Sequence, residues 1–303
     1  MAGERTILIS GASGLIGQAL AGALVGQGHR VLALGRQKGN APYWNIEEGV
    51  VSLGADKEID VVIHLAGENV AQGYWTAKKK ERILQSRVEG TRLLAEFFAG
   101  TPHKPHLMIS ASAIGFYGER GEEKLEEQSR KGTGFLADVA QAWEEAALSA
   151  REAGIRVVHP RFGMVLSPEG GALNKMLPPF TKGLGGTLGN GKQYMSWISI
   201  HDVVQAILHI MEHEELEGAV NLVAPHPVTN RQFTKELGQV IHRPAFLPVP
   251  KFFLSLFLGE MAKELLFAST RVYPRRLQES GYVFAEPDLT TALQTLLALG
   301  SDA

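Results

Sequence analysis

Residues 6–17 read TILISGASGLIG, and this stretch decides how the rest of the chain is interpreted. Ile7 to Ile9 is a short apolar run rich in β-branched residues, which predicts a strand buried on both faces. Gly11, Gly14 and Gly17 follow at intervals of three, and apolar residues then recur with helical spacing. A glycine turn between a buried strand and a helix is typical of a dinucleotide site, where the backbone approaches a pyrophosphate at the helix N-terminus. The alternative is a purely structural glycine turn.

The composition of the 303-residue chain is that of an ordinary globular protein. Its net charge of −2 predicts neither nucleic-acid binding nor attachment to a membrane surface. The sequence contains no cysteine, which excludes disulfides, thiolate nucleophiles and cysteine-ligated metals, and we expect no metal site. The first residues lack the pattern of a signal peptide, and the apolar run from Phe252 to Leu258 is too short to span a bilayer. We therefore expect a cytoplasmic protein.

A second buried strand is predicted from His29 to Leu34, and it ends at Gly35 and Arg36. Arg36 lies where dinucleotide folds that bind NAD carry an acidic residue for the ribose 2′-hydroxyl, about twenty positions past the glycine turn. A guanidinium there can stack on adenine and hold a 2′-phosphate through paired hydrogen bonds. The sequence therefore favours NADP over NAD, with a solvated arginine at a strand end as the alternative.

Apolar runs alternate with amphipathic segments as far as Val165, which predicts an α/β protein with a doubly wound, mostly parallel Rossmann sheet. Further strands are expected at residues 50–53, 60–65, 105–110 and 155–158. Long helical segments are expected at residues 75–98 and 134–153. We expect residues 1–165, with returning segments near 194–224, to form the dinucleotide-binding domain. A smaller, mainly helical substrate lobe is expected from residues 166–193 and 225–303.

Small residues follow the strand at 60–65, in the segment Leu65-Ala66-Gly67-Glu68-Asn69. Such residues let a cofactor lie against the backbone at the carboxyl ends of parallel strands, where open α/β sheets bind ligands. Arg87, in the helix that follows, could turn inward beneath the cofactor, whereas the charged run before it is typical of a solvated helix face. Because Pro160 lacks an N–H group, the strand that begins at Ile155 is expected to end there or to lie near a sheet edge.

The strand at 105–110 continues into ISASAIGFYG, residues 109–118. Ser112 could hydrogen-bond a substrate carbonyl, and Tyr117 could donate a proton to the developing alkoxide. The alternative is a serine-rich turn that caps the strand, with Tyr117 packed at a boundary between lobes. The residues alone leave both interpretations open.

Beyond Val165 the alternation of strands and helices stops. Glycines and prolines between Ser167 and Gly191 predict loops around a short helix, in a region that belongs to the substrate lobe. Asp202 is expected to cap a helix from Val203 to Glu212. His201 or Asp202 could instead be catalytic.

Motifs spread over nearly the whole chain resemble those of the extended short-chain dehydrogenase/reductases. The resemblance rests on GASGLIG at 11–17, LGR at 34–36, HLAGEN at 64–69, SRVEGT at 86–91, ISASAIGFYG at 109–118 and PRFGMVLSPEGGAL at 160–173. More narrowly, the chain is similar to an atypical branch, the epimerase family proteins, also described as nucleoside-diphosphate-sugar epimerases. YMSWISIHD at 194–202 and the C-terminal segment with YPRRLQESGY at 273–282 resemble the same branch, including its short C-terminal domain of unknown function.

The resemblance implies an NADP(H) site in this chain. At the pyrophosphate it implies Gly11, Ser13, Gly14, Leu15 and Ile16. At the 2′-phosphate it implies Gly35 and Arg36. Leu65 and Ala66 would contact the adenosine half of the cofactor, with Gly67 in the same loop. Arg87 would lie near the cofactor, and Pro160 would lie at its nicotinamide end.

The chain departs from the family at the residues that transfer protons. Typical members carry a Ser, a Tyr and a Lys, the last two spaced Y-x-x-x-K on the helix after the fifth strand, where the lysine lowers the pKa of the tyrosine. Here Phe135 and Val139 stand at about those two positions, and neither can move a proton.

Two functions remain open from the sequence. The first is an NADP(H)-dependent oxidoreductase or nucleotide-sugar epimerase-like enzyme that acts on a carbonyl or carbinol through an unusual proton donor. The second is a non-catalytic NADP(H)-binding protein that reports redox state to a partner. The expected ligand is a small-molecule substrate, with a nucleotide sugar as one candidate, and we expect a monomer or a homodimer.

Overall fold

The computed structural model describes residues 3–39, 42–54 and 58–299. Its strands are β1 (Thr6–Ser10), β2 (Arg30–Leu34), β3 (Tyr43–Asn45), β4 (Val50–Ser52), β5 (Val61–His64), β6 (Leu107–Ser110), β7 (Ser112–Ala113), β8 (Lys124–Leu125), β9 (Arg156–Phe162), β10 (Met164–Leu166), β11 (Tyr194–Met195), β12 (Trp197–Ser199), β13 (Gly218–Leu222), β14 (Val228–Thr229) and β15 (Arg271–Val272). Its helices are α1 (Leu15–Gly26), α2 (Ala77–Ala99), the short 3-10 helix η1 (Ile114–Tyr117), α3 (Phe135–Glu145), α4 (Leu148–Glu152), α5 (Gly171–Thr181), α6 (Ile200–Glu212), α7 (Asn230–Val240), α8 (Lys251–Leu258), α9 (Glu260–Leu265), α10 (Arg275–Glu279) and α11 (Leu289–Leu299).

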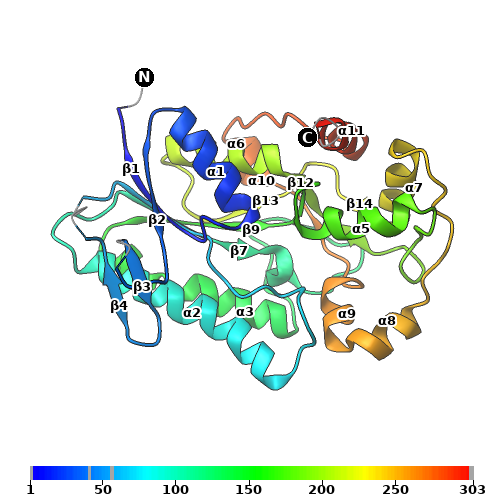
Figure 1. Ribbon diagram of the computed structural model, residues 1–303, viewed down its shortest axis with the longest axis horizontal. Coiled ribbons are helices and arrows are strands. Elements are labelled where there is room, and N and C mark those ends of the chain that lie inside the picture. Colours follow the sequence, from blue (N-terminus) through cyan, green and yellow to red (C-terminus); the bar gives the residue numbers. More distant parts are fainter. Residues whose placement is uncertain (1–2, 40–41, 55–57, 300–303) are drawn as a thin grey trace.

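A parallel sheet forms the centre of the molecule (Figure 1). Its strands are ordered β13-β9-β6-β5-β1-β2, with β7 beside β9. Neighbouring strands of this sheet run parallel, which confirms the predicted α/β fold with a doubly wound sheet. The chain starts at β1, moves outward to β2 and then crosses to β5 on the other side of β1. This reversal creates a topological switch point between β1 and β5, where open α/β sheets bind their ligands.

Helices cover both faces of the sheet. On one face α1 and α6 pack over a core that contains Ile7, Ile9 and Ile207. On the other face α2 and α4 pack over a core that contains Leu8 and Leu94. Because successive residues of a strand point to opposite faces, the run Ile7-Leu8-Ile9 of β1 contributes to both cores. Burial on both sides explains why this strand is apolar without alternation.

The predicted strand at 50–53 does not join the central sheet. It forms β4, which pairs with β3 in a separate antiparallel hairpin. Trp44 of this hairpin is buried, with its ring edge-on to His64 at 5.5 Å between ring centres. An antiparallel partner a few residues away needs no crossover helix, whereas a place in the parallel sheet does. The expectation failed because a short apolar run does not identify the strand with which it pairs.

The expectation for Pro160 was only half right. The strand does not end there, since β9 continues to Phe162, but it does lie near a sheet edge, as an internal strand beside the edge strand β13. Pro160 is buried and stands opposite Val220 of β13. On its other side β9 pairs with β6 as far as Val158 and with β7 from Arg161 onward. The residue without an N–H group therefore falls where the neighbouring strand is already interrupted.

A second core lies beside the sheet, in the C-terminal part of the chain. It is formed by α5, α7 and α11 around Trp197, Phe233 and Leu293, all of which are fully buried. Short strand pairs, β10 with β12, β11 with β14 and β8 with β15, connect this part to the rest of the molecule. In Figure 1, α8 and α9 lie side by side beyond the end of α3.

The helix α6 begins earlier than predicted. Its N-cap is Ser199, whose hydroxyl accepts a hydrogen bond from the backbone N–H of Asp202 at 3.1 Å. The buried carboxylate of Asp202 instead accepts hydrogen bonds from the hydroxyl of Tyr282 (2.8 Å) and from the N–H groups of Ala285 and Glu286 (both 2.9 Å). Asp202 therefore fastens the C-terminal segment to α6, and its expected role as the cap was wrong.

We expect Asp202→Ala to lower the free energy of unfolding by about 3 kcal/mol, because the buried N–H of Glu286, the partly buried N–H of Ala285 and the hydroxyl of Tyr282 would lose their charged acceptor. The matched control is Glu89→Ala, which removes an exposed carboxylate paired with an exposed arginine, Arg92, in the middle of α2. We expect this control to change stability by less than about 0.5 kcal/mol. Urea denaturation of both variants measures the difference, and equal effects would contradict the assigned role of Asp202.

Candidate functional site

The glycine turn after β1 touches the loop after β5. A Cβ on Gly11 would lie 2.8 Å from the amide nitrogen of Ala66 and 2.9 Å from the carbonyl carbon of Leu65. Gly11 also has a φ of +75°, which residues with side chains rarely adopt. A Cβ on Gly17 would collide with the carbonyl oxygen of Gly11. These two glycines are therefore required by the close approach of backbone segments at the switch point.

Gly14 has a different role, because it leaves the N-terminus of α1 open. It is the exposed N-cap of α1, and no side chain among the described residues caps this helix. In contrast, hydroxyl groups of Thr76, Ser199 and Thr229 cap α2, α6 and α7. An open helix N-terminus offers unpaired N–H donors and a partial positive charge, which suit an anion such as a phosphate.

The other predicted residues of this turn surround Gly14. Ser13 is exposed beside it. Leu15 and Ile16 begin α1, and both are half-buried against the second core. The backbone of the whole segment from Gly11 to Ile16 therefore lies at the carboxyl end of β1, where the family resemblance implies a pyrophosphate site.

Gly35 and Arg36 follow β2 in the way that Gly11 follows β1. The last residues of these two strands, Ser10 and Leu34, are paired. The carboxyl ends of parallel strands meet at one edge of the sheet, so Arg36 and the glycine turn share that edge. The backbone of Gly35 is fixed by hydrogen bonds with Pro42 (3.1 Å) and Trp44 (2.9 Å), while Arg36 is exposed. Arg36 therefore presents an exposed guanidinium at the same sheet edge as the glycine turn.

Arg87 turns inward, beneath the loop that follows β5. Its guanidinium donates hydrogen bonds to the carbonyl oxygens of Glu68 (3.0 Å) and Ile83 (3.2 Å), and it lies 4.9 Å from the ring centre of Trp143. A Cβ on Gly67 would come within 3.3 Å of the guanidinium carbon, so the absence of a side chain there lets the loop rest on Arg87. Burial lowers the pKa of Arg87 to about 10, against the opposite effect of Glu68, and the group stays charged at neutral pH.

The same loop is held from α2 by two further contacts. The side chain of Lys79 donates a hydrogen bond to the carboxylate of Glu68 at 2.6 Å. The backbone N–H of Glu68 donates to the hydroxyl of Ser86 at 3.0 Å. The hydrogen bond from Lys79 lowers the pKa of Glu68 below its usual value. The helix α2 therefore fixes both the backbone and the side chain of Glu68 beside the switch point.

Ser112 and Tyr117 belong to one buried polar network. The hydroxyl of Ser112 donates to Glu144 at 2.6 Å. Glu144 also accepts two hydrogen bonds from the guanidinium of Arg161, at 2.7 and 2.8 Å. Arg161 donates a further hydrogen bond to the hydroxyl of Tyr117 at 2.9 Å, and this hydroxyl donates to the side-chain oxygen of Asn221 at 2.7 Å. The network joins β7, α3, β9 and β13.

Within this network Tyr117 is fully buried. Burial raises the pKa of Tyr117 to about 12, although the Arg161 guanidinium acts in the opposite direction. A side chain that exchanges protons with a substrate near neutral pH needs a pKa closer to 7 and a path to the substrate. The geometry therefore favours the packing alternative for Tyr117 over the catalytic one.

Sequence analysis did not single out Glu144, Arg161 or Asn221. Arg161 and Asn221 stand directly opposite each other on β9 and β13. The guanidinium of Arg161 also lies 3.5 Å from the ring centre of Phe116. The signal that could have identified Arg161 is a charged residue inside an apolar strand, because a buried charge requires a partner. Glu144 gives no such signal, because the sequence does not distinguish it from its neighbour Glu145, which is exposed on the same helix.

Phe135 and Val139, the two residues that sequence analysis placed at the Tyr and Lys positions of the family, lie in the first half of α3. Phe135 is half-buried, with Trp75 edge-on to its ring at 5.2 Å and the ammonium of Lys80 at 4.5 Å from its centre. Val139 lies one turn further along α3 and is buried. The first turn of α3 therefore packs, through the ring of Phe135, against an indole ring and an ammonium group.

The structure thus gathers some of the predicted residues and separates others. Gly11 to Ile16, Gly35 with Arg36, and Leu65 to Gly67 lie at the carboxyl ends of β1, β2 and β5, around the switch point. Arg87 lies beneath the last of these loops. Ser112, Tyr117 and Pro160 lie further along the sheet, on or next to β7 and β9.

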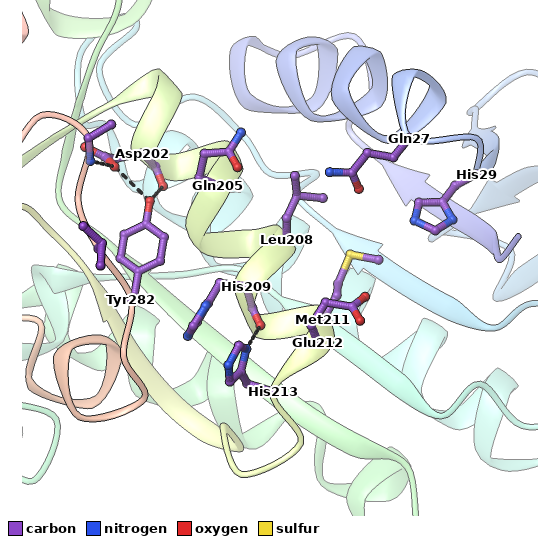
Figure 2. A pocket seen from close by; sticks show the side chains of 12 residues that line it. Gln27, His29, Asp202, Gln205, Leu208, His209, Met211, Glu212, His213 and Tyr282 are labelled. Atoms are coloured by element: carbon purple, nitrogen blue, oxygen red, sulfur yellow. Dashed lines mark hydrogen bonds between the residues drawn. The ribbon is translucent and has the colours of Figure 1, made fainter. Parts of the chain in front are cut away.

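A separate groove of about 660 Å³ follows α6 on the outside of the molecule (Figure 2). Gln27 and His29 line it where α1 ends and β2 begins, which is the edge of the sheet away from the glycine turn. His209 and His213 stack at 3.6 Å between ring centres along the same groove, near Tyr282. Within the part of the chain that the structure describes, no group of three or more His, Cys, Asp or Glu side chains could hold a metal ion.

Among the described helices, none combines the length and the apolar character needed to cross a membrane.

Comparison with known proteins assigns the chain to a family. Residues 7–223 match the NAD dependent epimerase/dehydratase family. The chain belongs to this family. The matched residues run from β1 to just beyond β13, so the epimerase/dehydratase part contains the glycine turn, the switch point and the buried network. Residues 249–296 match a domain of unknown function (DUF1731), which begins before α8 and ends within α11.

Relatives of similar sequence span almost the whole chain. The epimerase family protein ML0860 of Mycobacterium leprae is 41% identical over 96% of this chain and 95% of its own length. YfhF of Bacillus subtilis is 39% identical over 96% of this chain and 98% of its own. The epimerase family protein SDR39U1 of Mus musculus is 35% identical over 96% of this chain and 99% of its own. These matches confirm the resemblance to the epimerase family proteins.

Solved structures agree with this assignment. Human epimerase family protein SDR39U1 with NADPH has a TM-score of 0.88 and 31% identity, covering 97% of this chain and 99% of that one. The nucleoside-diphosphate sugar epimerase from Corynebacterium glutamicum has a TM-score of 0.81 and 33% identity, covering 98% of this chain and 59% of that one. A UDP-glucose 4-epimerase from Thermotoga maritima, at 19% identity and a TM-score of 0.75, shares the fold.

The raised pKa of Tyr117 predicts a loss of stability at alkaline pH. In the unfolded chain Tyr117 loses its proton near pH 10, whereas in the folded protein it keeps the proton up to about pH 12. Its contribution to stability is therefore complete below pH 10 and is lost as the pH rises toward 12, by about 2 kcal/mol. Urea denaturation of the wild type and Tyr117→Phe across this range isolates the effect. A stability difference between the two proteins that does not change with pH would contradict it.

Proposed function

We propose that this protein binds NADP(H) at the switch point between β1 and β5. The observation that carries the proposal is the open N-terminus of α1 at Gly14, at the same sheet edge as the exposed Arg36. One feature suits a pyrophosphate and the other suits a 2′-phosphate. Human SDR39U1, similar in structure over nearly the whole chain, was crystallised with NADPH, which supports the same cofactor here.

The residues at this edge fit such a cofactor. The first turn of α1 contains no acidic side chain, so nothing in it opposes a pyrophosphate laid against the backbone from Gly11 to Ile16. Arg36, next to Gly35, would hold the 2′-phosphate through charge-assisted hydrogen bonds. The adenosine half and the nicotinamide end would be contacted by Leu65, Ala66, Gly67, Arg87 and Pro160.

We further propose that the protein is an oxidoreductase or an epimerase-like enzyme acting on a carbonyl or carbinol. When bound, NADP(H) supplies or accepts a hydride. Residues 166–193 and 225–303 would form the lobe that holds a small-molecule substrate, and a nucleotide sugar is the leading candidate. The similarity to a nucleoside-diphosphate sugar epimerase at 33% identity supports this class. The second core around Trp197 favours the enzyme, because a sensor needs no separate substrate lobe.

A second candidate function is supported by the proton-transfer positions. Phe135 and Val139 cannot move a proton, and Tyr117 is buried with a raised pKa. A chain with these features could hold NADP(H) without turnover and report redox state to a partner. This alternative shares the cofactor site with the first and differs only in the chemistry that follows.

The role of Arg36 gives a direct test of the cofactor. We expect Arg36→Ala to weaken NADPH binding by roughly 10- to 100-fold, the loss of one or two charge-assisted hydrogen bonds. Binding of NADH should change little, because NADH has no 2′-phosphate for the guanidinium to hold. The control is Arg92→Ala, whose exposed side chain pairs with Glu89 on α2. Isothermal titration calorimetry measures both cofactors. No heat from NADPH with the wild type would reject the proposal, and equal losses for NADPH and NADH would reject the role of Arg36.

Turnover separates the two candidate functions. The purified protein is incubated with NADPH and a panel of small carbonyl compounds, and with NADP and a panel of nucleotide sugars. We expect at least one compound to be converted, with cofactor absorbance at 340 nm and product analysis as the measurements. Tight binding of the cofactor with no conversion across both panels would favour the redox sensor.

A further inference from the structure

The C-terminal domain reaches the candidate site through two carboxylates of α9. Glu260 and Glu264 are four residues apart and therefore lie on the same side of this helix. Glu264 contacts the N-terminus of α3, and Glu260 contacts α2. One short helix of the domain of unknown function thus touches both helices that border the switch-point loop.

The contact of Glu264 with α3 is built into the backbone. Its two carboxylate oxygens accept hydrogen bonds from the N–H groups of Phe135 and Leu136, both at 2.8 Å. The preceding residue, Gly134, has a φ of +116°, which residues with side chains rarely adopt, and a Cβ there would lie 2.7 Å from the nearer oxygen and push the carboxylate away. A negative charge at a helix N-terminus also interacts favourably with the helix dipole. Glu264 is therefore the cap that α3 lacks within its own segment.

Glu260 completes the contact on the other side. Its carboxylate accepts hydrogen bonds from the ammonium of Lys80 at 2.8 and 3.0 Å. The same ammonium lies over the ring of Phe135, which Trp75 meets edge-on. This pair is partly exposed, so by itself it adds little to stability. Its effect is to orient Lys80 and the aromatic cluster toward α9.

Side chains of both helices also support the loop from Leu65 to Glu68, those of α3 by way of Arg87 on α2. On α2, Lys79 is adjacent to Lys80 and binds the carboxylate of Glu68. On α3, Trp143 packs against the guanidinium of Arg87, which supports Gly67 and Glu68. The loop at the switch point therefore rests on the same two helices that α9 holds together.

We propose that α9 is a clamp by which the C-terminal domain controls the release of the cofactor, with Glu264 as its principal positioning residue. The clamp holds α2 and α3 in the arrangement that keeps the loop from Leu65 to Glu68 in place over Arg87. When Glu264 leaves the N-terminus of α3, this loop loosens and the cofactor departs faster. The inference rests on the proposed function in that the cofactor is taken to be NADP(H).

The test uses the full-length protein and compares Glu264→Gln with Glu279→Gln. Glutamine has no charge, and its amide N–H₂ group would face one of the two backbone N–H groups that the carboxylate oxygens of Glu264 now accept from. Glu279 is an exposed carboxylate of the same domain, paired with Arg275, and serves as the matched control. We expect Glu264→Gln to release NADPH about fivefold to tenfold faster in stopped-flow fluorescence, an allosteric coupling of ordinary size. Glu260→Gln should change the rate by less than about twofold, because its pair is partly exposed, and Glu279→Gln should leave it unchanged.

Amide hydrogen exchange adds a readout that does not depend on the cofactor. In Glu264→Gln we expect faster exchange at residues 135–138 and also at Glu68, whose N–H is bonded to Ser86. If protection is lost at 135–138 while Glu68 and the NADPH release rate match the Glu279→Gln control, α9 is only a packing contact and the clamp is wrong. If the wild type binds no NADPH, the cofactor proposal fails. Exchange at Glu68 alone then decides whether Glu264 holds the loop in place. Glu264→Asp keeps the charge on a shorter side chain. Its NADPH release rate and its exchange at Glu68 should lie between those of the wild type and those of Glu264→Gln. This variant carries the test if the glutamine variant does not fold.

Discussion

One close approach between two backbone segments, Gly11 against Ala66, sets the geometry of the candidate site. A side chain at Gly11 would meet the backbone that follows β5, so β1 and β5 can be neighbours with stacked loops only when this residue is glycine. The N–H of Gly14 then bonds to the carbonyl oxygen of Gly11 at 2.9 Å, which starts α1 at the carboxyl end of β1. The open helix N-terminus is therefore a product of how the chain turns.

Short-range rules predicted the parts of the structure that depend on neighbouring residues. The apolar run, the glycine spacing and the following helix lie within a few turns of one another, so their pattern located the sheet edge and its candidate site. The same rules failed where the partner is distant. Asp202 bonds to groups 80–84 residues further along the chain, and a capping rule sees only the next turn. Pro160 looks unsuited to an internal strand until β9 is seen to change its neighbour from β6 to β7 beside it.

The roles of Ser112 and Tyr117 could not be decided from the sequence because they depend on a buried ion pair. Removing Arg161 and Glu144 from water is costly, and the cost is offset only when their remaining hydrogen-bonding groups also find partners. The hydroxyls of Ser112 and Tyr117 are two of those partners. A serine and a tyrosine near a strand end have the same appearance in a sequence whether they face a substrate or complete such a network. Only the positions of Arg161 and Glu144 distinguish the two cases.

The start of α3, where sequence analysis expects Phe135 and Val139 in place of the family's Tyr and Lys, is also where the C-terminal domain makes contact. Val139 is buried, so a lysine at its place would need a partner for its ammonium. Phe135 needs no hydrogen bond from its ring, and its face accepts the ammonium of Lys80. The backbone N–H groups of this turn still need hydrogen-bond acceptors, and the carboxylate of Glu264 in the C-terminal domain supplies them. The turn at which sequence analysis expects the catalytic tyrosine of typical members is in this chain a point of contact between the epimerase/dehydratase part and the C-terminal domain.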